Sequence, residues 1–314
     1  MFDRQLNRLQ LELSITPRGP VLIRRGRSGA DPTRPNLEWV RTTVDGAPSV
    51  YLPGSSLKGV LRSHAERLLR SENIPITGTF DENARKKFNQ SDRGDTVHVG
   101  TCPLGRTFGS LALRSRLAIS DHLPGGSDPP GSPARQAQLE AANRTEDRNG
   151  VAIDRLLGSA LPGALYDQEV VVAGRFDGRI VLHNFQLYQL ALLLFLLRDL
   201  DDGFVQIGSS TTRGFGWVSA SLRRLVIESR RGKLPAGRLG GLGELESPEM
   251  ATRYGLFGGD HIDLPDGWTV RRDAAGLFDR LELGPDHRDE LESRLGAGPW
   301  QRFLDASKKG AWVA

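Results

Sequence analysis

The feature that most constrains the fold is a helical pattern at residues 51–70, YLPGSSLKGVLRSHAERLLR. Its mostly apolar positions recur three and four residues apart, which places them on one face of an α-helix. Pro53 and Gly54 turn the chain into this helix, and Ser55 or Ser56 is positioned to cap it. An apolar helix face needs a second layer to cover it, and this face consists of Leu57, Val60, Leu61, His64, Ala65, Leu68 and Leu69.

Strand-like patterns supply that second layer. Residues 9–15, LQLELSI, alternate apolar and polar side chains, as a half-buried strand does. An Asp-Gly pair at 177–178 lies between two such runs and predicts a hairpin turn there. Residues 185–200 predict a second helix that is apolar nearly all round. The further strand-like runs are residues 21–25, 115–121, 166–176, 178–184, 204–208 and 214–229.

The order of these elements predicts the fold class. Strand, helix, strands, helix, strand is the order of a ferredoxin-like or RRM-like βαββαβ core, an α+β fold whose two helices cover one face of the sheet and leave the other free. We expect this domain to span residues 1–230, with insertions at about 71–107 and 122–175. Within the second insertion, residues 124–150 have the composition of a mobile loop. Residues 231–314 form a C-terminal extension, Gly-rich at first and then in short helices.

The composition excludes several classes of protein. Cys102 is the single cysteine, so a disulfide framework and a cysteine-based zinc site are excluded, and a reducing cytoplasm is the expected setting. The first residues lack the pattern of a signal peptide. The most apolar run, Leu190 to Leu197, is too short to span a membrane. The formal net charge of +4 fits a phosphate-binding protein without requiring one.

Two segments carry candidate phosphate contacts. At the start of the first helix, Lys58 and Arg62 share a face away from the apolar stripe, and the helix end itself attracts anions. An ordinary capped helix with a solvated basic face explains the same residues. Residues 208–217, GSSTTRGFGW, combine glycines, hydroxyl groups and Arg213 in a pattern typical of anion-binding turns, although a tight hairpin would do so too. The GK[ST] ending of a P-loop is missing, so nucleotide triphosphate hydrolysis is unsupported.

Taken together, these segments carry a family resemblance. LPGSSLKGVLR, followed far downstream by IGSSTTRGFGWV, closely resembles the signature of the RAMP superfamily. Between them, CPLGRTFGS with SRLAISD resembles the family's loop and strand, and NGVAIDRLLGSALPGALYDQEVV resembles its protruding thumb hairpin. The resemblance covers roughly residues 8–228 and is nearest to the backbone subunit of type III CRISPR effector complexes, of subtype III-D.

The resemblance implies RNA partners and sites for them. The chain would bind guide RNA (crRNA) and target RNA, beside other copies of itself and other effector subunits, with sequence left to base pairing. The insertions would form a lid and a thumb, the thumb at about residues 155–170 pushing between bases of the guide and target duplex. The residues that would bind RNA are Ser55, Ser56, Lys58, Arg62, Gly208, Thr212, Arg213, Gly214 and Gly216.

The resemblance also implies an endoribonuclease activity on target RNA. In cutting members of the family, an aspartate in the loop after the first strand lies beside each displaced nucleotide, and cleavage needs a divalent metal, Mg²⁺ or Mn²⁺. Asp31 lies in the matching loop and would activate the 2′-hydroxyl or hold the metal. Glu38 could occupy the same place. No tightly bound cofactor is expected.

Two alternatives stay open. The chain could be a purely structural backbone subunit, with cleavage by a partner. It could also be a guide-precursor processing endoribonuclease that uses histidines as bases. His64 lies on the apolar helix stripe and is expected to be a hydrogen-bonded core residue. No zinc-ligand spacing occurs among the six histidines, which are His64, His98, His122, His183, His261 and His287.

Overall fold

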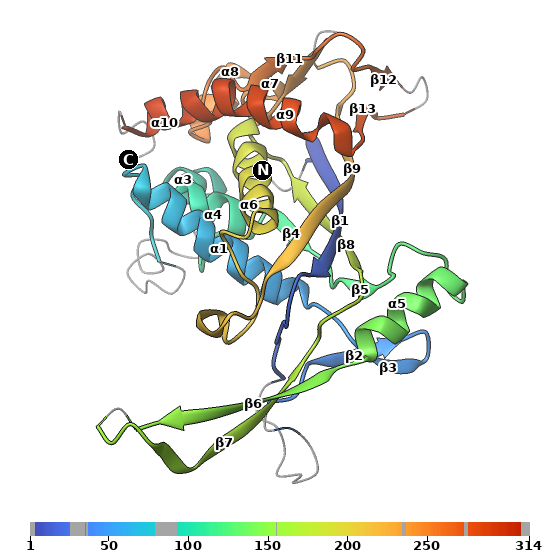
Figure 1. Ribbon diagram of the computed structural model, residues 1–314. Helices are drawn as coiled ribbons and strands as arrows, with labels where there is room; N and C mark the ends of the chain where they lie inside the picture. Colours follow the sequence, from blue (N-terminus) through green and yellow to red (C-terminus); the bar gives the residue numbers. More distant parts are fainter. Residues whose placement is uncertain are drawn as a thin grey trace.

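The structure is a computed structural model that describes residues 4–25, 35, 37–78, 93–154, 156–233, 237–272 and 276–308. Its core contains the strands β1 (Asn7–Pro17), β4 (Leu117–Ile119), β8 (Phe176–His183) and β9 (Val218–Arg230) and the helices α1 (Gly54–Ser71) and α6 (Leu187–Asp201). These strands form one antiparallel sheet in the order β9–β1–β8–β4 (Figure 1). This is the βαββαβ arrangement, so the predicted fold class is confirmed.

The remaining elements surround this core. The other strands are β2 (Arg41–Val44), β3 (Ala47–Val50), β5 (Leu123–Pro124), β6 (Glu146–Ile153), β7 (Ala160–Val170), β10 (Arg238–Gly240), β11 (His261–Asp263), β12 (Val270–Arg272) and β13 (Phe278–Leu283). The other helices are α3 (Gly94–Val99), α4 (Pro103–Phe108), α5 (Pro133–Asn143), α7 (Leu242–Leu245), α8 (Pro248–Arg253), α9 (Arg288–Leu295) and α10 (Gln301–Lys308), with short turns η1 (Thr211–Arg213), η2 (Pro285–His287) and η3 (Gly296–Trp300).

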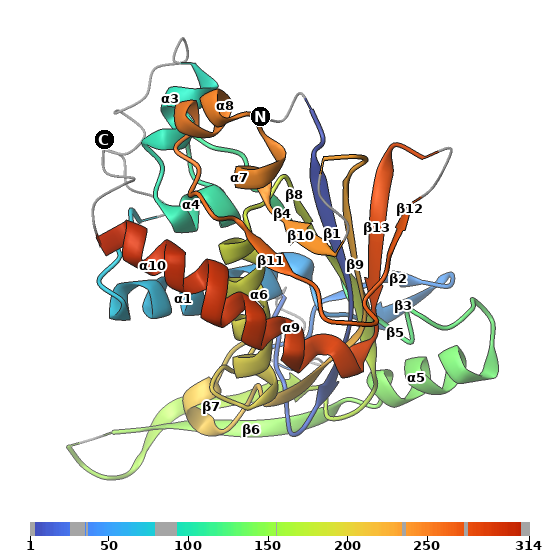
Figure 2. The ribbon, with the colours of Figure 1, turned by 90° about the horizontal axis from the view of Figure 1, so that it is seen from above.

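Helices cover one face of the sheet. Figure 2 shows α1, α6, α9 and α10 on the same side, while the other side of β1 and β9 stays open. Alternate residues of β1 are buried beneath the helices, Leu9 to Ile15 among them, as a period of two requires. On the open side, Glu12 of β1 pairs with Arg224 of β9 across 3.5 Å. Arg224 in turn pairs with Glu282 of β13 across 2.6 Å, so the charges of this face largely satisfy one another.

The C-terminal extension continues the same sheet. β13 pairs with β9, and β12 pairs with β13 at the edge. These strands were not predicted, whereas the short helices at the end of the chain were. The extension also closes the core, because Phe303 of α10 stacks on Tyr188 of α6 with 4.2 Å between the ring centroids. Residues 278–308 therefore belong to the packed body.

Helix α1 buries the predicted stripe, but its cap differs from the prediction. Leu57, Leu61, His64, Ala65 and Leu69 are all buried. Pro53 is the N-cap residue, and no side chain of the helix caps it, so the expected serine cap is wrong. The Gly54 N–H instead donates to Asp121 Oδ1 across 2.9 Å. A carboxylate from another segment thus satisfies the helix end.

The predicted hairpin turn at Asp177–Gly178 is also wrong. Both residues lie inside β8 and pair with Ser14 and Leu13 of β1. Glycine is required at 178 because a Cβ there would come within 2.5 Å of the His122 ring. Gly178 is therefore needed for the close approach of the His122 ring to the backbone, and the Asp-Gly sequence is not part of a turn.

Residues 124–150 were predicted to be a mobile loop, and this is wrong as well. They contain α5, which Ser132 caps by accepting a hydrogen bond from the Arg135 N–H across 3.3 Å, and most of β6. Ala142 is fully buried and Arg135 is 7% exposed, so the helix packs through one alanine and one long polar side chain. The Gly- and Pro-rich start of the segment masked the helix-forming run ARQAQLEAA.

Other predicted segments differ in part. Residues 21–25 make only isolated bridges, Val21 to Val171 and Arg24 to Trp39, and residues 204–208 form no strand. Within 71–107, predicted as a surface insertion, α4 is wholly buried and packs on α1. The predicted loop that contains Asp31, residues 26–36, lies outside the described residues except for Pro35.

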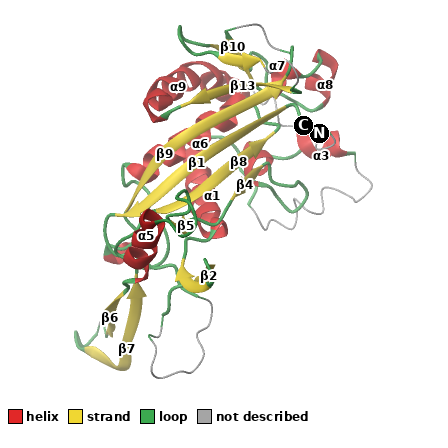
Figure 3. Ribbon diagram, turned by 90° about the vertical axis from the view of Figure 1, so that its right-hand side faces the viewer, coloured by secondary structure: helices red, strands yellow, loops and turns green. Residues whose placement is uncertain are grey.

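Strands β6 and β7 form a hairpin that projects beyond the body (Figures 1 and 3). The thumb predicted at about 155–170 corresponds to the second half of this hairpin, and β6 supplies the first half. Large apolar side chains near its tip face solvent, with Leu156 92% and Leu157 74% exposed. Solvent-facing side chains of this kind, gathered at a protruding tip, indicate contact with another molecule.

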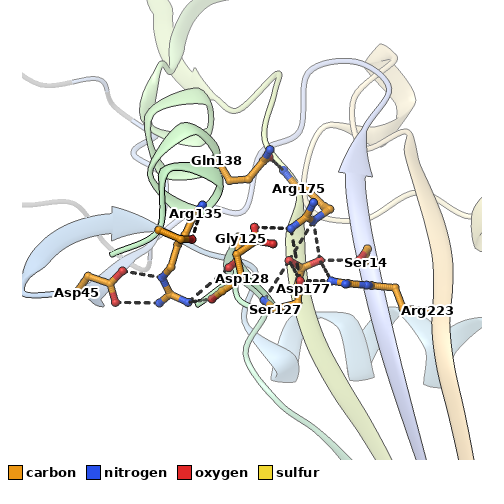
Figure 4. Close-up of polar contacts among 11 residues, drawn as sticks. Ser14, Asp45, Gly125, Ser127, Asp128, Arg135, Gln138, Arg175, Asp177 and Arg223 are labelled. Atoms are coloured by element: carbon orange, nitrogen blue, oxygen red, sulfur yellow. Dashed lines mark hydrogen bonds and ion pairs between the residues drawn. The ribbon is translucent and has the colours of Figure 1, made fainter. Parts of the chain in front are cut away.

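A buried carboxylate, Asp177 of β8, joins the segment ahead of α5 to the sheet (Figure 4). It accepts hydrogen bonds from Ser14 Oγ across 2.5 Å and Ser127 Oγ across 2.7 Å, and it pairs with Arg175 across 3.1 Å. Burial alone raises the pKa of Asp177, but these hydrogen bonds outweigh it and leave the pKa below its ordinary value. The carboxylate is therefore held in its charged form.

Arg175 and Arg135 extend this network to α5. Arg175 also pairs with Asp128 across 2.5 Å, and Arg135 of α5 pairs with Asp45 in the β2–β3 turn across 2.6 Å. The backbone N–H of Arg175 donates to Gln138 Oε1 of α5 across 2.8 Å. We call these residues, with Asp177, Ser14 and Ser127, the Asp177 network. It fixes α5, from which β6 follows directly, against the sheet.

We expect Asp177→Ala to lower the free energy of unfolding by roughly 2 kcal/mol, because the buried hydroxyl group of Ser14 loses its acceptor and Arg175 keeps only Asp128 as its ion-pair partner among the described residues. Chemical denaturation followed by circular dichroism measures this. Asp147→Ala, at an exposed position of β6, is the matched control and should change the unfolding free energy by less than about 0.5 kcal/mol. Equal effects of the two substitutions would contradict the role assigned to Asp177.

Candidate nucleic-acid interface

The Gly-rich segment 208–216 is held close to the chain that follows β1. The Ser209 N–H donates to the Leu22 carbonyl and the Gly216 N–H to the Pro20 carbonyl, each across 2.8 Å. Gly208 has φ +81°, and a Cβ there would lie 2.2 Å from the Leu22 carbonyl oxygen. These two ends are pinned by backbone contacts that only glycine permits at position 208. We call residues 208–216 the glycine loop.

Between its pinned ends, the glycine loop contacts the base of the hairpin. The guanidinium of Arg213 lies over the Tyr166 ring of β7, 5.4 Å from its centroid. Gln168 of β7 donates from Nε2 to Ser210 Oγ across 3.1 Å. Ser210 itself has a left-handed backbone with φ +60°, and Gly214 has φ +87° with open space around it. The loop is thus shaped by its own turn and positioned by β7.

An open groove of about 570 Å³ lies at this junction. It draws on three parts of the chain: the segment after β1, strand β7 and the glycine loop. Arg24 and Arg213 give it positive charge, and both are exposed. Among the described residues that line it there is no carboxylate, and the full lining is Arg24, Leu37, Tyr166, Gln168, Ser209, Ser210, Thr212 and Arg213. Its charge and hydrogen-bonding groups suit a phosphate-bearing ligand.

The basic residues of α1 have intramolecular partners. Lys58 Nζ donates to Ser115 Oγ across 2.7 Å and to the Leu117 carbonyl across 2.8 Å. Arg62 donates to the Gly109 carbonyl across 2.7 Å. Burial lowers the pKa of both groups, and the charge of Arg62 lowers that of Lys58 further. The two side chains brace the 109–117 segment and do not form a fully solvated basic face.

The two predicted RNA-binding segments do not meet in the described part of the chain. Lys58 lies against β4, Arg213 lies over β7, and no hydrogen bond or groove described for either includes the other. At the α1 end, Ser55 is exposed and Ser56 half-buried, while Asp121 occupies the Gly54 N–H. A phosphate there would have to bind beside a fixed carboxylate, so the α1 contacts stay a prediction.

Of the two predicted catalytic residues, only Glu38 lies among the described residues. Asp31 lies outside the described residues. Glu38 is buried, and its carboxylate is 3.8 Å from Arg25 Nη1. Within the described ranges, no three His, Cys, Asp or Glu side chains are grouped as a metal site requires. Glu38 is held as an ion-paired side chain, and the metal-binding role of Asp31 stays a prediction.

The histidines are engaged inside the fold. His64 Nε2 lies 2.7 Å from Asp199 Oδ2, which confirms the prediction of a hydrogen-bonded core residue. Burial lowers the pKa of His122 to about 4. A histidine base has to reach its substrate, and none of the six is exposed: His64, His98 and His122 are buried, and His183, His261 and His287 are half-buried. This arrangement does not favour the guide-processing alternative.

Sequence reasoning missed the four groove residues outside the glycine loop: Arg24, Leu37, Tyr166 and Gln168. Tyr166 and Gln168 stand in the run YDQEVV, where their alternation predicted a strand and gave no sign of a ligand site. An aromatic side chain beside a polar one on a predicted hairpin is a weak signal, since most such residues pack locally. Only the tertiary contacts, of Tyr166 with Arg213 and of Gln168 with Ser210, single them out.

The sheet, its two helices and the projecting hairpin define an α+β protein with a ferredoxin-like core and a basic groove at the hairpin base. The family model of the RAMP superfamily matches residues 14–219, more than half of the 314-residue chain, and the chain belongs to that superfamily. The superfamily is associated with CRISPR RNA-binding complexes. A comparison with curated proteins returned no match. No helix within the described ranges is long and apolar enough to cross a membrane.

Two glycine substitutions test how the glycine loop is held. We expect Gly214→Ala to cost about 1–2 kcal/mol, the strain of a left-handed backbone, because space around it is open. Gly208→Ala should cost more, since its Cβ would also meet the Leu22 carbonyl oxygen. Thermal and chemical unfolding measure both. Equal losses would show that the loop is not pinned at Gly208.

Proposed function

We propose that this protein is the guide-RNA-binding backbone subunit of a type III CRISPR ribonucleoprotein, close to subtype III-D, which positions complementary target RNA for cleavage at regular intervals. Membership of the RAMP superfamily supports the RNA-binding setting. The groove between the glycine loop and β7 is the proposed binding site for the RNA strand. Two exposed arginines line it, and its described lining contains no carboxylate that would repel a phosphate.

The observation that carries the proposal is the coupling of this groove to the hairpin. Gln168 and Tyr166 contact the glycine loop, while the same strand β7 continues to the apolar tip at Leu161. If the phosphates of an RNA strand bind in the groove, the bases of that strand lie next to the hairpin. The exposed apolar tip suits insertion between base pairs, since it gains contacts there that water does not provide.

The proposed cleavage residue belongs to the segment between β1 and β2. Arg24 and Leu37, which stand before and after Asp31 in the sequence, both line the groove. This neighbourhood supports Asp31 as the residue that cuts, by activating a 2′-hydroxyl of the RNA as internal nucleophile. A bound Mg²⁺ or Mn²⁺ would stabilise charge on the phosphate, and Asp31 is its proposed ligand.

One observation favours the alternative of a structural subunit whose partner cuts. Glu38, the second catalytic candidate, is buried and faces Arg25. A carboxylate in this setting is a structural ion pair more readily than a catalyst, since its charge is already compensated. With Glu38 set aside, the cutting subunit and the structural subunit differ in whether Asp31 is catalytic.

We expect Arg213→Gln to weaken binding of single-stranded RNA whatever its sequence and to reduce the slope of log affinity against log salt by about 0.7, the loss of one phosphate contact. Fluorescence anisotropy over a salt series measures both quantities. Arg294→Gln on α9 is the matched control, because Arg294 pairs with Glu290 and lines no part of the groove. An unchanged slope for Arg213→Gln would refute this placement of the RNA.

In the complex assembled on guide RNA, Asp31→Ala should abolish cutting of bound target RNA, while Glu38→Ala should leave cutting in place and lower stability. Gel analysis of labelled target RNA measures the cuts, and filter binding checks that target RNA is still bound. Cutting at the usual spacing with both substitutions would show a structural subunit. Loss of cutting with Glu38→Ala alone would move the catalytic role to Glu38.

A further inference from the structure

Tyr166 is held in an unusual position for a residue at the base of a hairpin. It pairs with Gly150 of β6 across the hairpin, and a Cβ on Gly150 would lie 2.3 Å from Cζ of the tyrosine ring. The ring therefore lies across the bare backbone of Gly150, a place that any side chain at 150 would take. The absence of a side chain at Gly150 thus allows the ring to take this position.

The hydroxyl group of Tyr166 plays no part in holding the ring. It is buried, and within the described residues it has no hydrogen-bond partner. A buried hydroxyl without a partner costs stability compared with a phenylalanine of the same shape. What Tyr166 contributes to its surroundings is thus its aromatic ring alone.

The ring has Arg213 as its neighbour on the groove side. The guanidinium carbon lies 5.4 Å from the ring centroid, within the range of a cation–π contact. Both groups are flat, and both line the groove together with the side chains of Gln168, Ser210 and Thr212. Those three offer amide and hydroxyl groups that can hydrogen-bond to a base edge.

The chemistry of this groove matches a nucleotide more closely than a bare phosphate. Flat aromatic and guanidinium groups are the surfaces on which proteins stack unpaired RNA bases. The groove, at about 570 Å³, has the size of a small-ligand site. Two exposed arginines at its rim can hold the phosphates on either side of the base.

We infer that Arg213, supported from beneath by the Tyr166 ring, forms a stacking platform for one unpaired base of the bound RNA strand, and that the groove is a single-nucleotide subsite. The inference rests on the proposed function and adds a base-binding role to a loop that was expected to bind phosphates only. Because stacking accepts every base, the subsite takes any sequence and fixes the register of the strand relative to the hairpin.

The test uses the full chain and two fluorescein-labelled probes: a single-stranded RNA of mixed sequence, and an RNA of equal length whose central residues are abasic. We expect Tyr166→Ala to weaken binding of the base-bearing RNA roughly tenfold, because Arg213 loses the ring that supports it as a stacking surface, and to leave binding of the abasic RNA unchanged. Tyr166→Phe should bind both probes as the unsubstituted chain does, because the hydroxyl makes no bond.

Gly150→Ala provides an independent variant that keeps the tyrosine. Its Cβ displaces the ring, so it should reduce affinity for the base-bearing RNA as Tyr166→Ala does and spare the abasic probe. Circular dichroism confirms that each variant is folded. Arg213→Gln should weaken binding of both probes, since it removes charge as well as a stacking surface.

The outcomes separate this inference from the proposed function. If Tyr166→Ala weakens both probes equally, the ring only supports the glycine loop, and the platform is overturned. If it weakens neither while the unsubstituted chain binds RNA with its salt dependence intact, the inference fails and the proposed function stands. If the unsubstituted chain binds neither probe, both fail.

Discussion

The charged carboxylate of Asp177 is the interaction on which the arrangement of the molecule depends. From inside β8 it holds Ser14 of β1 and Ser127 ahead of α5, and through Arg175 it reaches Asp128. It acts together with the Gly125 N–H, which donates to the Arg175 carbonyl, and with the Arg175 N–H, which donates to Gln138 of α5. Strand β7 is also held by a bridge between Gln168 and Leu37 and by the ion pair of Glu169 with Arg41, so the direction of the projecting hairpin follows from these contacts together with the Asp177 anchor.

The RNA-binding proposal depends on where the hairpin lies, because strand β7 forms one side of the groove. Strand β7 brings Tyr166 and Gln168 to the glycine loop, which is itself pinned to the chain after β1 at Gly208. The ferredoxin-like core thus supplies a rigid support, and segments far apart in sequence meet at its end to make a groove. Loops carried on a rigid scaffold are the usual place for a binding site, because they can vary without disturbing the core.

Much of the core could be predicted from the sequence, and the errors share a cause. The 3.6-residue period of α1, the apolar run of α6 and the alternation of β1 are local patterns that burial on one face enforces. Asp177–Gly178 was read as a turn because a local signal cannot reveal a distant serine or the His122 ring. Helix α5 was missed because it buries little apolar surface and is held by Arg135 and its partner Asp45.

The sequence by itself determined the fold class, the order of the strands and helices of the core, and the glycine loop, because periodicity and glycine content act on neighbouring residues. Its motifs determined the family. Only the tertiary structure decided that Lys58 and Arg62 brace the body through backbone carbonyls and that Asp121 caps α1. It likewise decided that Tyr166 lies beneath Arg213. These contacts join residues about 50 or more positions apart, and their partners are chosen by packing of the whole sheet, which no local pattern encodes.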